Sequence, residues 1–243
     1  MLRVCLAIIL LTLAVALPAS ANTSYVLNGS FESTTNGNGQ LGYNTNATNW
    51  TNQNNAGTWG YNFLFAPGTA DTTGAVGSAG TVSLWGPGNG SNNGLTTSPN
   101  GGYFIAADPV YQTGTISQVI NGLTVGQEYA VQFYWAGAQQ YTFNGATTEG
   151  WQVTLGSSTQ STGTISNVSH GFTGWRLATM DFVATSTSET LSFLALGTPS
   201  GLPPFVLLDG VSMIAAPEPG TFVLIGLGLL AIPLGARRIR KRT

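Results

Sequence analysis

The chain has 243 residues, a formal net charge of −2 and only 7% charged residues. Five of its seven Lys and Arg residues lie between positions 237 and 242, so residues 22–216 contain eight acidic residues and Arg176 as their single Lys or Arg. Because binding to a phosphate backbone needs clustered Lys and Arg, this distribution excludes a nucleic-acid-binding function.

The first 21 residues are predicted to be a signal peptide. A basic residue precedes an apolar run over residues 4–17, and Ala19-Ser20-Ala21 places small residues at the −3 and −1 positions of a cleavage site. An N-terminal membrane helix is the alternative, but the run is short for a span and a proline ends it. The only cysteine, Cys5, lies in this segment, so we expect the exported protein to contain no disulfide.

Residues 22–214 are predicted to form one all-β domain. Short β-branched or aromatic runs alternate there with clusters of Gly, Asn and Pro, which is typical of an antiparallel β-sandwich or barrel. The clearest strand is residues 128–135, where alternate apolar residues share one face. We expect loops over residues 36–57, 66–80 and 86–101, and strands over residues 25–32, 59–65, 81–85, 102–107, 115–120, 127–137, 150–156, 174–184, 189–196 and 205–214.

The last segment, residues 215–243, has three consecutive parts. Pro217-Glu218-Pro219 is followed by an apolar run over residues 221–236 and a basic end over residues 237–243. As a helix the 16-residue run is about 24 Å long, which is short for a hydrocarbon core of about 30 Å. The basic end nevertheless favours a single transmembrane helix with its C-terminus in the cytoplasm, because cytoplasmic headgroups attract Lys and Arg. The alternative is a buried C-terminal strand or core helix.

This arrangement resembles a PEP-CTERM sorting tail, which occurs on secreted proteins of Gram-negative bacteria that make extracellular polysaccharide. The resemblance implies an exosortase-type membrane protease as a partner, acting near Pro217, Glu218 and Pro219 and releasing the protein from a membrane-anchored intermediate to the cell surface or extracellular matrix. It covers about a tenth of the chain.

Several local phrases of the body occur in a characteristic order. They are Asn28-Gly29-Ser30-Phe31-Glu32, Gly102-Tyr103-Phe104-Ile105-Ala106, Ile116-Ser117-Gln118, Leu123-x-x-Gly126-x-x-Tyr129, Gly174-Trp175-Arg176 and residues 205–212. In this order they resemble the galactose-binding-like jelly rolls, which include many carbohydrate-binding modules. The resemblance implies two antiparallel sheets, a structural calcium ion and a sugar site on one concave sheet or among the loops.

Glu32 and Asp209 are the best candidates for calcium ligands. As a regular strand, residues 205–213 would place Asp209 on the same face as Val211 and Met213, where an ionised carboxylate needs a cation or several hydrogen-bond donors. The termini of jelly rolls commonly run close together, so Glu32 can approach Asp209, and calcium prefers carboxylate and backbone oxygens. In the alternative, Asp209 caps a turn with Gly210 and faces solvent.

Two of the six tryptophans are candidates for stacking on sugar rings. Trp50 and Trp59 bracket the Asn-rich segment, and Asn or Gln beside an indole can hydrogen-bond sugar hydroxyls. Core packing is the alternative for every tryptophan, and we expect it for Trp135 and Trp175.

The sequence does not indicate an enzyme. His170 is the only histidine and lies in a Gly- and Ser-rich stretch, and no Gly-x-Ser-x-Gly motif occurs. One histidine and no cysteine in the exported part exclude the usual zinc sites. Glycosidase chemistry needs two placed carboxyl groups, but the acidic residues share no motif, and Asp108 precedes Pro109 in an expected turn.

The favoured hypothesis is therefore a non-enzymatic exported surface or matrix protein that binds or associates with extracellular polysaccharide. The alternatives are a purely structural biofilm or surface-coat protein without a sugar site and, less favoured, a secreted glycan hydrolase.

Overall fold

A computed structural model describes residues 23–54 and 56–216. The predicted signal peptide, the Pro217-Glu218-Pro219 motif, the predicted transmembrane helix and the basic end lie outside the described residues, and the predicted domain boundaries stay a prediction. The elements are β1 (Gly39–Gln40), β2 (Thr51–Asn54), β3 (Asn62–Phe65), β4 (Ala75–Gly77), β5 (Gly80–Val82), the 3₁₀ helix η1 (Pro87–Asn89), β6 (Phe104–Ala107), β7 (Gly114–Asn121), β8 (Glu128–Gln139), β9 (Thr147–Leu155), β10 (Ser158–Ser161), β11 (Ile165–Asn167), β12 (Arg176–Val183), β13 (Ser188–Thr198) and β14 (Pro204–Ala215).

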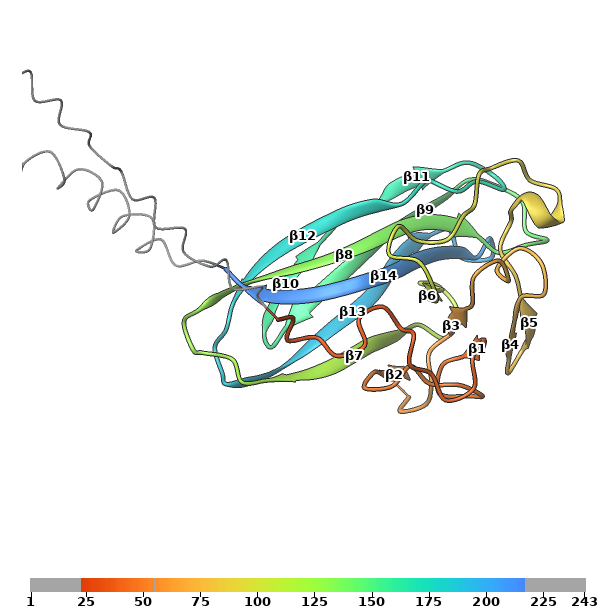
Figure 1. The fold of residues 1–243 in the computed structure, drawn as a ribbon. Helices are drawn as coiled ribbons and strands as arrows, with labels where there is room; N and C mark the ends of the chain where they lie inside the picture. Colours follow the sequence, from red (N-terminus) through yellow and green to blue (C-terminus); the bar gives the residue numbers. More distant parts are fainter. Residues whose placement is uncertain (1–22, 55, 217–243) are drawn as a thin grey trace, which may run out of the picture.

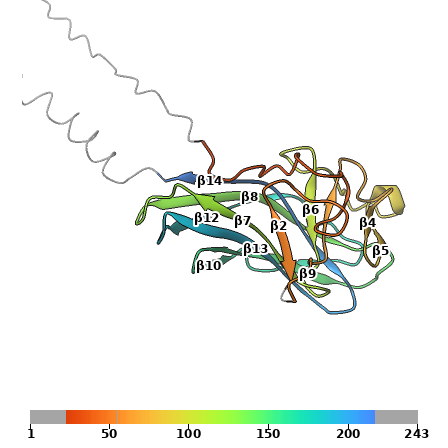
Figure 2. The same cartoon turned by 90° about the horizontal axis from the view of Figure 1, so that it is seen from below.

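Two antiparallel sheets make up most of the described chain. The first has the strand order β1-β3-β6-β14-β8-β12, and the second has the order β10-β9-β13-β7-β2 with β11 also paired to β9. The sheets pack face to face as a β-sandwich (Figures 1 and 2). The predicted all-β antiparallel fold is confirmed for this part of the chain. Among residues 23–54 and 56–216, no helix is long and apolar enough to span a membrane.

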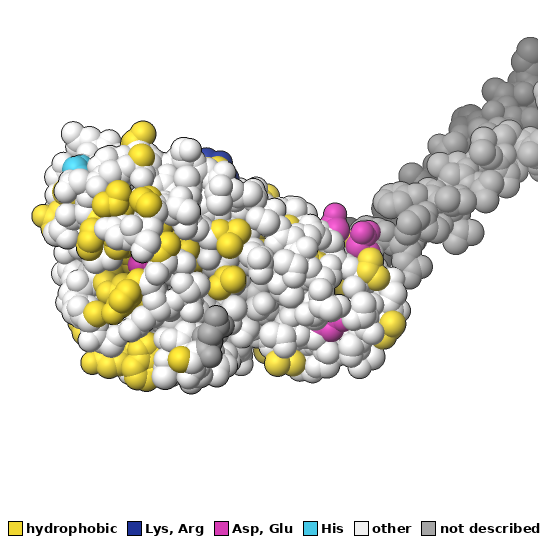
Figure 3. All heavy atoms as spheres, turned by 180° about the vertical axis from the view of Figure 1, so that it is seen from behind, with side chains coloured by type: hydrophobic (Ala, Val, Ile, Leu, Met, Phe, Trp, Pro, Cys, Tyr) yellow, Lys and Arg dark blue, Asp and Glu magenta, His cyan; other side chains and the backbone are white. Residues whose placement is uncertain are grey.

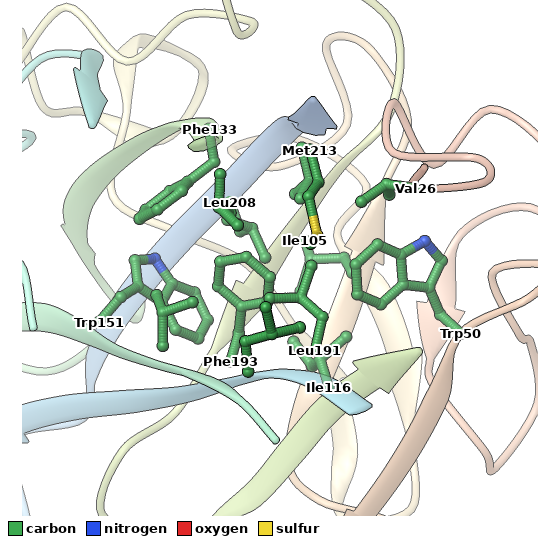
Figure 4. Close-up of a cluster of buried hydrophobic side chains, with 14 of the residues drawn as sticks. Val26, Trp50, Ile105, Ile116, Phe133, Trp151, Leu191, Phe193, Leu208 and Met213 are labelled. Carbon is green, nitrogen blue, oxygen red and sulfur yellow. The ribbon is translucent and has the colours of Figure 1, made fainter. Parts of the chain in front are cut away.

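The main hydrophobic core lies between the sheets. Side chains that alternate along the long strands meet there, with Phe133 and Leu208 from the first sheet against Trp151 and Phe193 from the second (Figure 4). The Trp151 indole Nε1 also donates a hydrogen bond to the carbonyl of Leu207 at 3.0 Å. This bond ties the second sheet to β14 through the core.

A second cluster covers the outer face of the first sheet. Phe63, Phe65, Phe205 and Leu207 point away from the main core and are covered by residues of the segment 70–84, which includes the β4–β5 hairpin. All four residues of β3 and of β6 are buried, because these strands have one cluster on each face. Strands covered on both faces have near-continuous apolar sequences.

A β-bulge in β14 corrects one predicted face. The pairing of β14 with β8 shifts register between Asp209 and Ser212, and Gly210 has a positive φ of 60°. A bulge adds one residue, so the side chains beyond it change faces. Val211 and Met213 therefore lie in the main core, whereas Asp209 belongs to the outer face with Phe205 and Leu207, contrary to the prediction that Asp209 shares a face with Val211 and Met213.

Two predictions for the N-terminal part are wrong. Residues 25–32 do not form a strand; Asn28 and Phe31 have φ values of 50° and 58°, which interrupt an extended chain. The expected loop at 36–57 contains β1 and β2, which pair with β3 and β7 respectively. Polar strands of this kind are formed by their partners rather than by local propensity.

Both described ends of the chain lie at one end of the sandwich (Figure 1). The Tyr25 amide donates to the Met213 carbonyl at 2.8 Å, and the Ala216 amide donates to the Glu128 carbonyl at 2.9 Å. Since β8 and β14 run antiparallel and have 12 residues each, the opposite end is roughly 40 Å away at about 3.3 Å per residue. We call these the tail-proximal end and the distal end.

One carboxyl group is buried against the first sheet without a counter-charge on its hydrogen-bond partners. The Thr147 hydroxyl donates to Glu149 Oε1, while Glu149 Oε2 has no partner among the described residues. Gly137 makes room for it, since a Cβ there would lie 2.6 Å from Oε2. Burial raises the pKa of Glu149 to about 7, although hydrogen bonds with Thr147 and Asn167 oppose the rise.

The raised pKa of Glu149 predicts that stability falls as the pH rises. The folded state holds this proton at pH values where the unfolded chain, with an ordinary pKa of 4.5, has lost it. The stabilisation is therefore complete below about pH 4.5 and is lost as the pH rises toward 7. We expect Glu149→Gln, which mimics the protonated acid, to reduce the difference in unfolding free energy between pH 4.5 and 7.5 by about 2 kcal/mol.

Urea unfolding at the two pH values measures this difference. Glu128→Gln is the matched control, because Glu128 is exposed at the start of β8. An equal pH dependence in the wild type and Glu149→Gln would contradict the assignment.

Candidate functional site

The predicted calcium ligands lie beside one segment, residues 98–103. Asp209 is fully buried on the outer face of β14. Its Oδ1 accepts a hydrogen bond from the Gly210 amide at 2.6 Å, whereas its Oδ2 has no partner among the described residues. Glu32 is exposed, and its Oε1 accepts a hydrogen bond from the Tyr103 amide at 2.8 Å.

Burial and the charge of Glu32 both act on the Asp209 carboxyl group. Burial raises the pKa of Asp209 to about 7, the polar Ser98 side chain, the Gly210 amide and the Asn100 side chain oppose this rise, and the negative charge of Glu32 adds to it. The alternative in which Asp209 faces solvent is wrong, because the side chain is fully buried. The alternative also expected Asp209 to contact Gly210 locally, and the hydrogen bond from the Gly210 amide is such a contact.

Gly102 allows the Glu32 carboxylate to approach this segment. It has a φ of +73°, and a Cβ there would lie 1.7 Å from Glu32 Oε1. Any larger residue would displace the carboxylate and would also strain the backbone. The Gly-Tyr-Phe phrase at residues 102–104 thus has a physical role in positioning Glu32.

The chemistry of these groups fits a hard cation. Glu32, Asp209, Ser98 and Asn100 offer oxygens, which are the ligands that calcium prefers. The orphaned Oδ2 of Asp209 is a buried acceptor that a cation could satisfy. No group of three or more acidic, His or Cys side chains in the described part of the chain could hold a metal, so neutral oxygens would complete the coordination.

Trp50 lies in the main core rather than in a groove. Its side chain is 7% exposed, it packs against Phe31 and Phe193, and its Nε1 donates to the Asn28 carbonyl at 3.0 Å (Figure 4). The predicted role in sugar stacking needs an open ring face, so Trp50 would have to leave the core to perform it.

Trp59 lies in a surface groove, as a stacking residue must. The groove has a volume of about 340 Å³ and is lined by Thr51, Asn52, Gln53 and Thr58 in addition to Trp59. Gly42, with a φ of +82°, closes one side, and a Cβ there would lie 2.9 Å from Trp59 Cβ. The lining contains no charged residue.

Tyr43 is a partner that the sequence did not indicate. Its ring lies 5.7 Å from the Trp59 ring, with an angle of 52° between the planes, and it is 48% exposed. Asn52 is engaged in the fold: its Nδ2 donates to the Leu41 carbonyl, and its Oδ1 accepts from Asn62. The exposed Thr51 and Gln53 therefore remain to contact a ligand beside the two rings.

The other tryptophans mainly stabilise the fold. Trp135 is buried as expected, and Trp175 is partly buried against the second cluster, with its Nε1 donating to the Thr96 carbonyl. Trp85 stacks on His170 with 3.8 Å between the ring centroids. The Nε2 of His170 contacts Asn144 Oδ1 at 2.5 Å, so its side-chain contacts are an indole and an amide, neither of which is a nucleophile or an acid.

Comparison with known proteins gives one family match and several similar structures. No curated protein matches the chain. Among solved structures, the chain is similar to TmCBM61, described in complex with β-1,4-galactotriose (15% identity, TM-score 0.41, covering 80% of this chain and 99% of that one). It is also similar to the K1 cleaved adhesin domain of Lys-gingipain from Porphyromonas gingivalis W83 (11% identity, TM-score 0.44, covering 77% and 96%). A third is the CBM22-1 xylan-binding domain of Paenibacillus barcinonensis Xyn10C (11% identity, TM-score 0.38, covering 82% and 99%).

The family match falls on the C-terminal segment. Residues 215–241 match the family described as the PEP-CTERM protein-sorting motif. The match includes Pro217, Glu218 and Pro219 and begins at the last residue of β14. The chain therefore carries a PEP-CTERM protein-sorting motif directly after its β-sandwich.

Proposed function

We propose that this protein is a non-enzymatic, exported component of the cell surface or extracellular matrix that binds polysaccharide through the groove at Trp59 and Tyr43. The observation that carries this proposal is a groove whose described lining is uncharged and consists of Trp59 and polar residues of and near β2, with the exposed Tyr43 ring packed against the Trp59 ring. Aromatic faces stack on the C–H faces of sugar rings, and Thr and Gln side chains can hydrogen-bond their hydroxyls.

The placement of the groove supports this function. β7 ends at Asn121, close in sequence to the start of β8, which lies at the tail-proximal end. The start of β7, Gly114, therefore points toward the distal end, and it pairs with Asn54 of β2. The groove thus lies away from the tail-proximal end of the sandwich. While the tail holds the protein at the membrane of a Gram-negative cell, an extracellular polymer could reach the groove. An exosortase-type protease acting near Pro217–Pro219 would then release the protein to the surface or matrix.

Calcium is proposed as a structural ion at Glu32 and Asp209, with Ser98 and Asn100 as further ligands. When bound, it would neutralise the charge that Asp209 carries in its buried position. Glu32 lies in the N-terminal segment and Asp209 on the last strand, so the ligands would join distant parts of the chain around residues 98–103.

A purely structural coat protein without a sugar site is the second candidate. It is favoured by the burial of Trp50, Trp135 and Trp151, which leaves few open indole faces. A secreted glycan hydrolase is less favoured, because such chemistry needs two carboxyl groups facing one cleft. The Trp59 groove has none among its described lining residues.

Replacement of Trp59 tests the proposed function. We expect Trp59→Ala to weaken binding to whichever polysaccharide the wild type recognises by at least about tenfold, equivalent to about 1.4 kcal/mol, because a stacking surface is lost. Since Trp59 is partly exposed, the melting temperature of the Trp59→Ala variant should be close to that of the wild type. A glycan array identifies the ligand, and calorimetry with the full chain in detergent measures the affinity.

Leu177→Ala, at an exposed apolar position on β12, is the control and should bind normally. If Trp59→Ala and Tyr43→Ala both bind the glycan with the affinity of the wild type, the glycan binds at another site. No binding to any glycan would favour the structural candidate.

A further inference from the structure

A cavity of about 370 Å³ opens at the distal end of the sandwich. It lies where β3 begins, β6 ends, β8 ends and β14 begins, and its lining includes Tyr61, Asp108, Tyr111, Gln140, Phe143 and Ser200. Its volume is in the range of small-molecule sites in proteins. Figure 3 shows hydrophobic side chains gathered over the distal end of the sandwich, with an acidic group visible among them.

Asp108 supplies the one carboxyl group of this lining. It is 1% exposed, and its Oδ1 accepts hydrogen bonds from the amides of Val110 and Tyr111 at 2.7 and 3.0 Å. These bonds hold the turn at Pro109, as the sequence predicted. Oδ2 has no hydrogen-bond partner among the described residues. Oδ1 thus stabilises the turn, whereas Oδ2 is buried without a hydrogen-bond donor among the described residues.

Aromatic residues line the same cavity as this carboxylate. Tyr61 packs edge-on against Tyr111, with 4.8 Å between the centroids and 89° between the planes. Burial, Tyr111 and the nearby charge of Asp108 raise the pKa of Tyr61 to about 12. The third aromatic residue of the lining is Phe143. The electron-rich faces of such rings favour a cation beside them.

No cation of the described chain is placed to compensate Asp108. The cavity lining contains no Lys, Arg or His, and Arg176, the single Arg or Lys between residues 22 and 216, lies over the Trp135 ring at 5.4 Å. An inorganic cation would require several oxygen ligands, but much of the lining is aromatic or aliphatic. An organic ammonium group, in contrast, needs one carboxylate oxygen and aromatic faces.

We propose that this cavity binds an amino-sugar residue of a partially deacetylated polysaccharide, with its ammonium group on Asp108 Oδ2. The choice of a sugar as the carrier of the ammonium group rests on the proposed function; Gln140 and Ser200 can hydrogen-bond its hydroxyls. The net negative charge of residues 22–216 also attracts a cationic polymer. The cavity is roughly one strand length, about 40 Å, from Ala215 at the end of β14, so a membrane anchored beyond that end would leave it accessible.

Calorimetry of the full chain with glucosamine oligomers and N-acetylglucosamine oligomers of equal length tests the proposal. We expect the glucosamine oligomer to bind at least tenfold more tightly. Asp108→Asn keeps the Oδ1 acceptor of the turn but removes the charge, and it should abolish this preference. Asp181→Asn, at an exposed position on β12, is the matched control and should keep it. Tyr111→Ala should weaken glucosamine binding while leaving the carboxylate in place.

The outcomes separate this proposal from the proposed function. Equal affinity for the two oligomers, or a preference that survives both Asp108→Asn and Tyr111→Ala, overturns the amino-sugar site. If neutral glycans bind in a Trp59-dependent manner and glucosamine does not bind, the cavity proposal fails while the proposed function stands. Tighter binding of Nα-acetyl-lysine amide than of glucosamine would replace the sugar with a lysine-bearing peptide and also overturn it.

Discussion

Chelation of calcium is expected to lower the melting temperature of the protein by roughly 10 °C at pH 7.5. A ligand that binds only the folded state stabilises it by about 3–4 kcal/mol when its free concentration is 100 to 1,000 times Kd. For a domain of this size, each kcal/mol changes the melting temperature by about 2–4 °C. The physical cause is the buried Asp209 carboxylate, whose Oδ2 has no partner among the described residues and whose other neighbours include the negative Glu32.

Thermal unfolding in millimolar calcium and in excess chelator, followed by tryptophan fluorescence, measures the effect. Asp209→Asn should lose the calcium-dependent shift, because the amide carries no charge, and Glu32→Gln should reduce it. Glu128→Gln is the control: Glu128 is exposed at the start of β8, at the tail-proximal end of the sandwich, so the shift should persist. Identical melting temperatures with and without calcium would contradict a structural calcium ion at Glu32 and Asp209.

The long strands could be predicted from the sequence because their burial is one-sided. In β8 the alternation of buried and partly exposed side chains from Tyr129 to Trp135 matches the alternation of apolar and polar residues in the sequence. β13 and β7 show the same pattern. The core they build follows from these local patterns, and no long-range information is needed to assign them.

The short strands and the bulge depend on partners that no local pattern shows. β2 has the sequence Thr-Asn-Gln-Asn and is extended because it pairs with β7. The shift at Gly210 moves Val211 and Met213 to the main core, and only the pairing with β8 reveals it. Asp209 is buried, as the predicted strand implied, but the bulge places it on the other face of β14 from Val211 and Met213, and its need for a cation stays a prediction.

The approach of two acidic residues could be anticipated from the sequence, whereas their role as calcium ligands stays a prediction. Two acidic residues far apart in the sequence were expected to approach one another, and Glu32 does affect the pKa of Asp209. Tyr43 and the distal cavity could not be found in this way, because the segments that form each site are brought together only by the two sheets. The local signal for Asp108, its position before Pro109, indicated a turn and not a site.

Replacement of Trp50 should separate core packing from sugar binding. We expect Trp50→Ala to reduce the unfolding free energy by about 3–5 kcal/mol, the usual cost of removing a large aromatic side chain from a core. The change also removes the hydrogen bond from Nε1 to the Asn28 carbonyl and the contacts with Phe31 and Phe193. The melting temperature should fall by roughly 10 °C or more.

Trp50→Phe, which keeps an aromatic ring in the core, should recover part of this loss. Because Trp50 precedes β2 directly, a binding defect in Trp50→Ala alone could arise from a displaced groove, so affinity must be measured below the melting transition and compared with Trp50→Phe. Normal affinity in Trp50→Phe, together with weak affinity in Trp59→Ala, would assign stability to one indole and recognition to the other. A large loss of affinity in Trp50→Phe without a loss of stability would instead mean that Trp50 leaves the core to meet the ligand.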